Sequence, residues 1–417
     1  MSGELTIYIG PNGYGKTKKL ETEKEKIENN NPNETIFLPS EILLEDELKD
    51  SENSKSMEYF LEEIFFNPPT VNELKTQIQQ EVNNNISILK DEINNIVDDI
   101  LKLNESTRQN EKDFITPSSK GIEYKKLLAI DKSVFKLIGS GQKMLLLLEF
   151  VLHSNKRFIF LDEPEKYMQP SLLKILGEKI RNLISQNKNV YISTHSPKLL
   201  SFLEFNLDSI NLLNKKNGIC KKIDLNEILN TINSKINIVK NIPDKYKKYF
   251  NLEDLKRSIL EIHEYNFYDA LFSRKVILCE GINDKLFIEK VLRDNNKQFE
   301  DYVIFPTFGK PNILIFLEIF NSLGIEVQFY FDVDSNTSDM QKNEWNNKIN
   351  DYFYKNYHDK CYGFTPNIEK ELDFNGKKKH DVLEFINHLD KFSFANSKYL
   401  IKDANEPCLN MDNNETN

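Results

Sequence analysis

Residues Lys275 to Asp284 read Lys-Val-Ile-Leu-Cys-Glu-Gly-Ile-Asn-Asp, and they decide the fold predicted for the second half of the chain. The apolar run from Val276 to Cys279 is typical of a buried strand, and apolar residues recur at helical spacing after Gly281. Glu280 therefore stands at the carboxyl end of a predicted parallel strand, where open α/β sheets bind their ligands. Asp284 follows one turn into the predicted helix and can point back to the same edge.

A second apolar run, from Val327 to Phe331, ends in Asp332-Val333-Asp334. Because side chains alternate along a strand, Asp332 and Asp334 lie on the same side. Carboxylates at neighbouring strand ends repel one another unless hard cations such as Mg²⁺ or Mn²⁺ lie between them. Either motif alone is also typical of an ordinary turn or a solvated loop. Together they predict a divalent-metal site, with the ligands Glu280, Asp284, Asp332 and Asp334.

The order of these motifs resembles a Toprim domain, a Rossmann-like α/β fold. In that fold a glutamate on the first strand and an Asp-x-Asp motif on a later strand hold divalent ions. Toprim domains occur in topoisomerases, primases, recombination proteins and nucleases, so the fold alone does not define the reaction. A topoisomerase is not expected, because we recognise no separate module that carries a nucleophilic tyrosine.

The first half of the chain opens with the short predicted strand Leu5–Ile9, followed at once by Gly-Pro-Asn-Gly-Tyr-Gly-Lys-Thr at residues 10–17. This segment fits the phosphate-binding pattern G-x-x-x-x-G-K-[ST] and has the expected strand before it and helical pattern after it. We expect its backbone N–H groups to surround phosphate oxygens, Lys16 to reach the β- and γ-phosphates and Thr17 to hold Mg²⁺. The predicted ATP-binding residues of this loop are Asn12, Gly13, Gly15, Lys16 and Thr17.

Further motifs follow in order: Gly-Ser-Gly-Gln at residues 139–142 before a predicted helix, Asp-Glu at 162–163 after an apolar strand, and a histidine at 195 after another. This order resembles the head of an ABC-type P-loop ATPase, over residues 1 to about 213. The resemblance implies that Asp162 holds Mg²⁺, that Glu163 is the catalytic base and that His195 is the switch histidine. It also implies a signature that binds the ATP of an opposite subunit, formed by Ser140, Gly141 and Gln142.

Several features depart from the usual ABC pattern. The signature serine is displaced, and no clear glutamine follows the second predicted strand, so Glu41 or a glutamine of the insertion is the candidate in its place. The strands that usually bring an adenine-stacking aromatic residue are missing before Gly10. Residues from about 42 to 133 show apolar side chains at three- and four-residue spacing, which predicts an amphipathic helical insertion that packs on the ATPase domain.

The composition limits the partners. The chain has 55 Lys and Arg against 65 Asp and Glu, a net charge of −10, so a nucleic-acid partner requires a local basic surface. Residues 244–257 interleave basic with aromatic residues and offer one, although a solvated helix face with buried aromatics is the alternative. The 4 scattered cysteines indicate a reducing cytoplasm. No apolar run approaches the roughly 20 residues that span a bilayer, so no membrane partner is expected.

An ABC-type head followed by a Toprim domain resembles the OLD (overcoming lysogenization defect) family of nucleases. Members couple an ATPase dimer to a metal-dependent nuclease, commonly in defence against phage. The resemblance also implies a later acidic metal ligand, which maps to Glu369, and a late catalytic lysine, which maps to Lys379. The predicted domains are an ATPase domain at 1–213, a helical linker at 214–270, a Toprim nuclease domain at 271–400 and a disordered tail at 401–417.

The predicted function is ATP-dependent, divalent-metal-dependent endonucleolytic cleavage of DNA in antiviral defence. ATP and Mg²⁺ or Mn²⁺ are the expected cofactors, and the carboxylates are expected to hold two cations that activate a water and stabilise the leaving oxygen. We expect a homo-oligomer that forms through the ATPase heads, with an accessory defence protein or an RNA as a further candidate partner. Two alternatives stay open: a Toprim ribonuclease that cuts tRNA under ATPase control, and an ATP-driven sensor whose Toprim domain is not catalytic.

Overall fold

The computed structural model has two compact units, Met1–Lys222 and Ile223–Asn417. The described residues are 3–11, 13–41, 57–65, 90, 91, 93–102, 114–117, 128–203, 205, 207–213, 220–236, 252–257, 259, 264–297, 302–334, 340–374, 382–395 and 397–401. Within these ranges, no helix combines the length and the apolar character needed to cross a membrane.

The first unit is built on a six-stranded sheet with the strand order β2-β5-β6-β1-β7-β8. Neighbouring strands run parallel except β8, which pairs antiparallel with β7. Parallel strands are buried on both faces, which explains their continuous apolar runs. The carboxyl ends of β1, β5 and β6 meet at one edge and bring the predicted ATP-site motifs together. The strands are β1 Leu5–Ile9, β2 Thr35–Leu38, β5 Phe158–Asp162, β6 Asn189–Ser193, β7 Ile210–Leu213 and β8 Cys220–Lys222.

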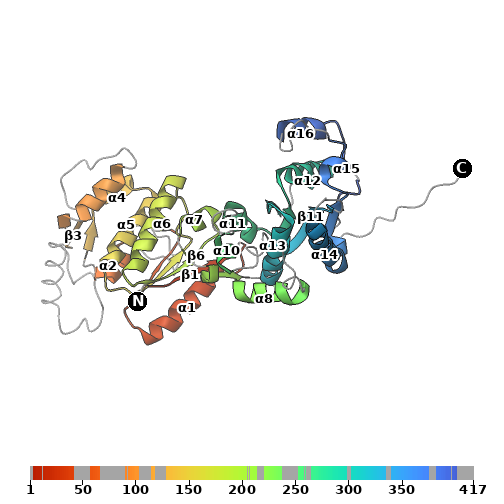
Figure 1. Cartoon of the computed structure of the whole chain (residues 1–417). Helices are drawn as coiled ribbons and strands as arrows, with labels where there is room; N and C mark the ends of the chain where they lie inside the picture. The colour runs from red at the N-terminus through yellow and green to blue at the C-terminus, as the bar shows by residue number, and fades with distance from the viewer. Residues whose placement is uncertain are drawn as a thin grey trace. The chain divides into compact units, whose positions relative to one another are not determined.

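Helices α5 (Ser140–Leu152) and α6 (Pro170–Ser185) pack against each other in this unit (Figure 1). α5 is buried over most of its surface, including the whole run from Met144 to Leu148, because α2 (Met57–Phe65) also packs against it. α6 buries one stripe at helical spacing, formed by Leu173, Leu176, Ile180 and Leu183. Further elements are α1 Lys16–Asn30, α4 Lys132–Leu137, α7 Pro197–Leu200 and the short 3-10 helix η3 Leu207–Ser209.

The insertion predicted at about 42–133 is described only in part, and the described part is not all helical. α2 is helical, and so are residues 93–102, where Ile93 and Ile100 are buried. Within the same insertion, however, β3 (Ile115–Pro117) and β4 (Leu128–Ile130) form an antiparallel pair, which the helical spacing did not predict. The reason is local, because the β-branched side chains at 115 and 116 favour a strand and a proline at 117 cannot lie inside a helix.

The second unit has a four-stranded parallel sheet in the order β10-β9-β11-β12. β9 (Lys275–Cys279) is the strand predicted before Glu280, and β11 (Glu326–Asp332) is the strand predicted before the Asp-x-Asp motif. Because β9 and β11 are hydrogen-bonded neighbours, their carboxyl ends lie side by side, as the metal-site prediction requires. The outer strands are β10 (Tyr302–Pro306) and β12 (Cys361–Phe364).

Helix α13 (Lys310–Leu323) is buried along almost its whole length. It packs against β9 and β11 and also against α8 (Leu225–Ile236) and α14 (Met340–Tyr357). α8 and α11 (Glu264–Phe272) fall in the predicted linker, but they pack on this unit, α8 against α13 and α11 against β10. The remaining elements are α10 Leu252–Arg257, α12 Ile282–Asp294, α15 Ile368–Glu371, α16 Val382–Leu389 and the short η7 His358–Lys360. Of the basic and aromatic stretch at 244–257, only α10 is described.

Candidate ATP site and candidate metal site

The phosphate-binding loop turns between the end of β1 and the start of α1. Gly13 and Gly15 have φ angles of 79° and 82°, and a Cβ at either position would meet nothing within 4 Å. The backbone conformation therefore requires glycine at both positions, although a side chain would have space. Helix N-termini carry N–H groups without intrahelical partners and bind anions through them, so the loop and α1 suit a phosphate. Asn12 lies outside the described residues.

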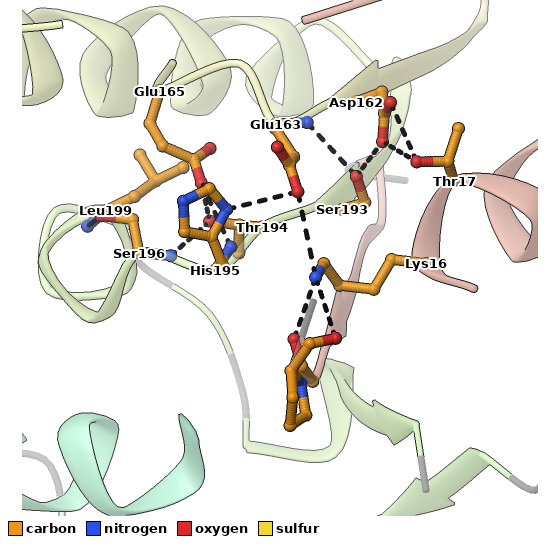
Figure 2. A network of polar contacts seen from close by, with 12 residues as sticks. Lys16, Thr17, Asp162, Glu163, Glu165, Ser193, Thr194, His195, Ser196 and Leu199 are labelled. Carbon is orange, nitrogen blue, oxygen red and sulfur yellow. Dashed lines mark hydrogen bonds and ion pairs between the residues drawn. The ribbon is translucent and has the colours of Figure 1, made fainter. Parts of the chain in front are cut away.

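Lys16 is buried and folds back over its own loop. Its Nζ donates hydrogen bonds to the carbonyl oxygens of Gly10 at 2.9 Å and Pro11 at 3.4 Å, and it lies 3.9 Å from Oε1 of Glu163 (Figure 2). Burial lowers the pKa of Lys16, and the charges of Glu163 and Asp162 oppose this shift. The Lys16 cation is thus held at the loop by two carbonyl oxygens, with the carboxylate of Glu163 nearby.

Asp162, at the end of β5, accepts hydrogen bonds from two hydroxyl groups. Thr17 Oγ1 donates to its two carboxylate oxygens at 3.0 and 3.1 Å, and Ser193 Oγ donates to Oδ1 (Figure 2). A threonine hydroxyl beside a carboxylate is the donor set that P-loop ATPases use for Mg²⁺. Thr17 and Asp162 therefore fit the predicted Mg²⁺ of the nucleotide. Ser193, which the sequence pattern did not single out, orients the carboxylate.

Glu163 lies between a lysine and a histidine. Its Oε1 is 3.3 Å from Nδ1 of His195 and 3.9 Å from Nζ of Lys16 (Figure 2). Its φ angle is 46°, in the left-handed region, and its N–H donates to the carbonyl oxygen of Ser193 at 2.9 Å. Non-glycine residues in this region are rare and concentrate at functional sites. The fold thus brings together the two residues predicted as base and switch.

Two of the predicted signature residues differ in their surroundings at the start of α5. Ser140 is exposed, whereas Gly141 is buried against the loop after β5. A Cβ at Gly141 would come within 2.7 Å of Cγ of Met168 and 3.1 Å of the carbonyl oxygen of Tyr167. Glycine is therefore needed here for close packing, whereas the neighbouring serine lies at the surface.

The side chain of the third signature residue, Gln142, makes hydrogen bonds within its own chain. Its Oε1 accepts a hydrogen bond from the N–H of Gly139 at 2.9 Å, and its Nε2 donates to the carbonyl oxygen of Ile100 at 3.0 Å. Gln142 therefore caps α5 and ties it to the insertion, which leaves Ser140 and Gly141 to carry the predicted contact with nucleotide. Glu41, the predicted substitute for the Q-loop glutamine, is exposed after β2.

Glu165 is an ATP-site residue that the sequence analysis missed. It is only 7% exposed, and its Oε1 accepts hydrogen bonds from Oγ1 of Thr194 at 2.6 Å and from the N–H of His195 at 3.1 Å. Burial raises its pKa. In the sequence, Glu165 is the second glutamate of Asp-Glu-Pro-Glu, but no neighbouring residue distinguishes it from a surface carboxylate.

The predicted metal ligands of the second unit gather at the carboxyl edge of its sheet. Glu280 Oε1 accepts a hydrogen bond from the N–H of Asp332 at 2.9 Å, which links the ends of β9 and β11 directly. Asp332 Oδ1 accepts from the N–H of Ile368, at the start of α15, at 2.9 Å. Asp284 Oδ2 accepts from the N–H of Gly281 at 2.6 Å. Each of these carboxylates is therefore held by a backbone amide.

Asp334 and Glu369 complete the predicted set. Asp334 has a φ angle of 53°, and its N–H donates to the carbonyl oxygen of Pro366 at 2.8 Å. Glu369 Oε1 accepts a hydrogen bond from Nδ2 of Asn283 at 3.3 Å, which connects α15 with the start of α12. Lys379, the predicted late lysine, lies outside the described residues.

The carboxylates at this edge raise one another's pKa. Burial and then the charge of Glu280 raise the pKa of Asp284 to about 8. Burial, then the charges of Glu280 and Asp284, raise the pKa of Asp332 to about 9. Burial also raises the pKa of Glu280, although Lys310 opposes the shift. Carboxyl groups that resist ionisation in this way form a site where a bound cation would relieve the repulsion.

The chemistry of these side chains fits a divalent cation, but their present arrangement does not enclose one. Among the described residues, no three Asp, Glu, His or Cys side chains are arranged to hold a single ion. The carboxylate oxygens bind backbone amides instead. Mg²⁺ and Mn²⁺ bind carboxylate oxygens and relieve the repulsion between them. Glu280, Asp284 and Asp332 would hold such an ion.

Lys310 is a cation beside these carboxylates to which the sequence analysis gave no role. It begins α13, and its side chain is 3% exposed. Its Nζ donates to the carbonyl oxygen of Val333 at 3.4 Å, and the same oxygen accepts from Nδ2 of Asn350 at 2.8 Å. The two donors fix the middle of the Asp-x-Asp motif. In the sequence, the position of Gly309-Lys310 shortly after an apolar strand could have indicated that this lysine lies at the same edge of the sheet.

Two protein families match separate parts of the chain. Residues 23–201 match the family described as “AAA domain, putative AbiEii toxin, Type IV TA system”, a range that contains Asp162, Glu163 and His195. Residues 271–334 match “Overcoming lysogenization defect protein-like, TOPRIM domain”, a range that contains Glu280, Asp284 and the Asp-x-Asp motif. The phosphate-binding loop and Glu369 fall outside both matches.

The chain is also similar to two proteins named as nucleases. “Endonuclease GajA” from Bacillus cereus (strain HuB5-5) is 26% identical over 199 residues, which is 46% of this chain and 28% of that protein. “Old nuclease” from Escherichia phage P2 is 28% identical over 181 residues, 42% of this chain and 27% of that protein. The similarity therefore covers little more than a quarter of either relative.

Among solved structures, an ATP-binding subunit of an ABC transporter has 13% identity and a TM-score of 0.33, over 55% of this chain and 82% of that one. An Smc head bound to the C-terminal winged-helix domain of ScpA has 14% identity and a TM-score of 0.30, over 52% of this chain and 88% of that one. Because these TM-scores are low, we draw no conclusion from either structure.

The two sheets and the two family matches define the class of protein. It is an α/β chain that joins a domain matching an AAA-type family model to a Toprim domain, and the predicted α/β fold class is confirmed. The Toprim match is to the OLD-like type, and the relatives include an Old nuclease. The predicted resemblance to the OLD family is thereby confirmed as well.

Proposed function

We propose that the protein is an ATP-hydrolysing, divalent-metal-dependent endonuclease that cuts DNA in defence against phage. The observation that carries the proposal is the sheet edge where Glu280, Asp284 and Asp332 meet, and where burial and the charge of Glu280 raise the pKa of Asp284 and Asp332. Such a concentration of buried and half-buried carboxylates is costly for the fold and is typical of a functional site. The printed names of the two relatives, an endonuclease and a nuclease, support the same reaction class.

At the ATP site, the proposed roles follow the contacts. Lys16 neutralises phosphate charge, and the Thr17–Asp162 pair holds Mg²⁺. Glu163 takes a proton from the attacking water, and His195, whose Nδ1 is 3.3 Å from Glu163, orients the reacting groups. The exposed Ser140 contacts the ATP of a second copy of the chain, so a homodimer of ATPase domains is part of the proposal.

At the Toprim edge, the proposed ligands are Glu280, Asp284, Asp332, Asp334 and Glu369. A bound divalent cation would activate a water molecule and stabilise the leaving oxygen of a phosphodiester. The amides that now bind these carboxylates keep them oriented at the edge. Lys310 places positive charge next to Glu280 and would offset charge on the scissile phosphate, with Lys379 as the second proposed lysine.

We also propose that the protein acts in the cytoplasm. Cys279 and Cys361 are free thiols, which supports a reducing compartment. An accessory defence protein or an RNA stays a proposed further partner.

The proposal is tested by incubating supercoiled plasmid and tRNA separately with the full chain in Mn²⁺ or in EDTA. The variants are Asp332→Asn and, as a matched control, Glu326→Gln, which changes an exposed carboxylate at the opposite end of the same strand. We expect the wild type and Glu326→Gln to cut plasmid in Mn²⁺ but not in EDTA, and Asp332→Asn to leave it intact. Cleavage of tRNA alone would replace DNA by RNA as the substrate, and no cleavage of either by the wild type would reject the nuclease.

A further inference from the structure

Glu165 is a buried carboxylate that the proposed ATP mechanism does not use. Its side chain reaches across to the segment after β6, where Oε1 accepts hydrogen bonds from Oγ1 of Thr194 at 2.6 Å and from the N–H of His195 at 3.1 Å (Figure 2). The same oxygen lies 3.7 Å from Nδ1 of the His195 ring. One carboxylate oxygen therefore contacts both the backbone and the ring of the proposed switch histidine.

Stability of the fold does not by itself account for a carboxylate at this position. Oε2 of Glu165 is buried without a hydrogen-bond partner among the described residues, and such an atom is costly. The segment after β6 has other restraints as well. The N–H of Thr194 donates to the carbonyl oxygen of Tyr8 at 3.0 Å, and Ser196 caps α7 by accepting from the N–H of Leu199 at 3.1 Å.

The His195 ring, in contrast, has little packing to restrain it. Its side chain is 45% exposed, and its Nδ1 faces two carboxylates, Glu163 at 3.3 Å and Glu165 at 3.7 Å. Glu165 also holds the backbone of His195, so it restrains the ring and its point of attachment together.

We propose that Glu165 is a positioning residue for ATP hydrolysis, which fixes His195 so that its Nδ1 faces Glu163. The inference rests on the proposed ATPase function and assigns a further residue to it. Removing Glu165 is expected to lower kcat by roughly 10- to 100-fold, as for other groups that orient a catalytic side chain. The KM for ATP should change by less than about threefold, because the phosphate contacts of Lys16 and Thr17 stay in place.

A double-mutant cycle on the full chain tests this assignment. The wild type, Glu165→Ala, His195→Ala and the double variant are compared for kcat and KM of phosphate release from ATP. If Glu165 acts through His195, adding Glu165→Ala to His195→Ala lowers kcat no further. If the two losses multiply, or if Glu165→Ala raises KM and leaves kcat unchanged, the proposal is overturned. Glu178→Gln, an exposed carboxylate on α6, is the matched control and should behave as the wild type.

Glu165→Gln keeps the cycle informative if Glu165→Ala does not fold. Its amide oxygen can still accept hydrogen bonds from Thr194 and His195, so its kcat should lie between those of the wild type and Glu165→Ala, and its effect should also vanish in the His195→Ala background. Failure of the ATPase proposal looks different. If the wild type releases no phosphate, or if Glu163→Gln hydrolyses ATP at the full rate, both the ATPase function and the role of Glu165 are rejected. If the losses of kcat in Glu165→Ala and His195→Ala multiply in the double variant, only the role of Glu165 is rejected.

Discussion

The ATP site and the Toprim edge contain similar acidic side chains but balance their charge differently. At the ATP site, Glu163 has Lys16 at 3.9 Å and His195 at 3.3 Å, and Asp162 accepts hydrogen bonds from two hydroxyl groups. At the Toprim edge, Glu280, Asp284 and Asp332 accept hydrogen bonds from backbone amides, and burial and the charge of Glu280 raise the pKa of both aspartates. The first site thus pairs one carboxylate with a lysine and a histidine ring, whereas the second gathers several carboxylates together, with Lys310 near Glu280.

This difference explains why the two sites should respond differently to metal. The Thr17–Asp162 pair already has the oxygen atoms of an Mg²⁺ site side by side. The Toprim carboxylates have the right chemistry, but no three described acidic, histidine or cysteine side chains are now arranged to hold one ion. We therefore expect metal binding to reorganise the Toprim edge more than the ATP site. The following predictions can break or sharpen this contrast.

The largest effect is expected for Glu280→Ala. Loss of a carboxylate at the strand end should lower Mn²⁺-dependent plasmid cleavage by on the order of 100-fold or more. ATP hydrolysis should stay near that of the wild type, because Glu280 belongs to the other unit. Plasmid cleavage is measured on a gel and ATP hydrolysis by phosphate release, with Glu326→Gln as the control. Undiminished cleavage by the Glu280→Ala, Asp332→Ala double variant would contradict the Toprim assignment.

A comparable loss is expected for Glu163→Gln in the other unit. The amide cannot take a proton from water, so ATP hydrolysis should fall by roughly 100-fold. ATP affinity should persist, because the loop and Lys16 are unchanged. Phosphate release and equilibrium binding of labelled ATP measure the two effects, and Glu178→Gln serves as the control. Equal losses of binding and hydrolysis would show that Glu163 supports the nucleotide rather than the reaction.

A smaller effect is expected for Ser193→Ala. The substitution removes one hydrogen bond to Asp162, worth about 1 kcal/mol, which corresponds to roughly five- to tenfold. The Mg²⁺ concentration at half-maximal ATP hydrolysis should rise by about this factor. Ser185→Ala, at the exposed end of α6, is the matched control. An unchanged Mg²⁺ requirement would mean that Ser193 does not orient the carboxylate.

The smallest effect concerns stability in EDTA. Asp332 has a pKa of about 9 in the fold against an ordinary value of 3.8. Between these values the folded state binds more protons than the unfolded state, so stability is lost as the pH rises. The melting temperature of the wild type should fall by a few °C between about pH 6 and 9, and less so for Asp332→Asn. Calorimetry measures this slope, and Glu326→Gln should keep the wild-type slope. A slope that Asp332→Asn leaves unchanged would remove the contrast with the ATP site.

The chemistry of both sites could be predicted from local sequence. Gly13 and Gly15 are recognisable because the phosphate-binding loop needs φ angles that L side chains rarely adopt. Glu280 and Asp332 are recognisable because buried parallel strands require apolar runs, and a carboxylate at the end of such a run marks the functional edge of the sheet. These patterns involve only a few neighbouring residues, so they can be recognised in the sequence without knowledge of the fold.

The tertiary structure alone decided how those residues are supported. Glu165 and Thr194, Gln142 and Ile100, and Lys310 and Val333 meet only after folding, across long separations in the chain. The strand pair in the predicted helical insertion and the packing of α8 on α13 likewise depend on distant partners. The physical reason is that helical and strand periodicity reports which face of an element is buried, whereas the identity of the opposing group depends on how separate elements pack.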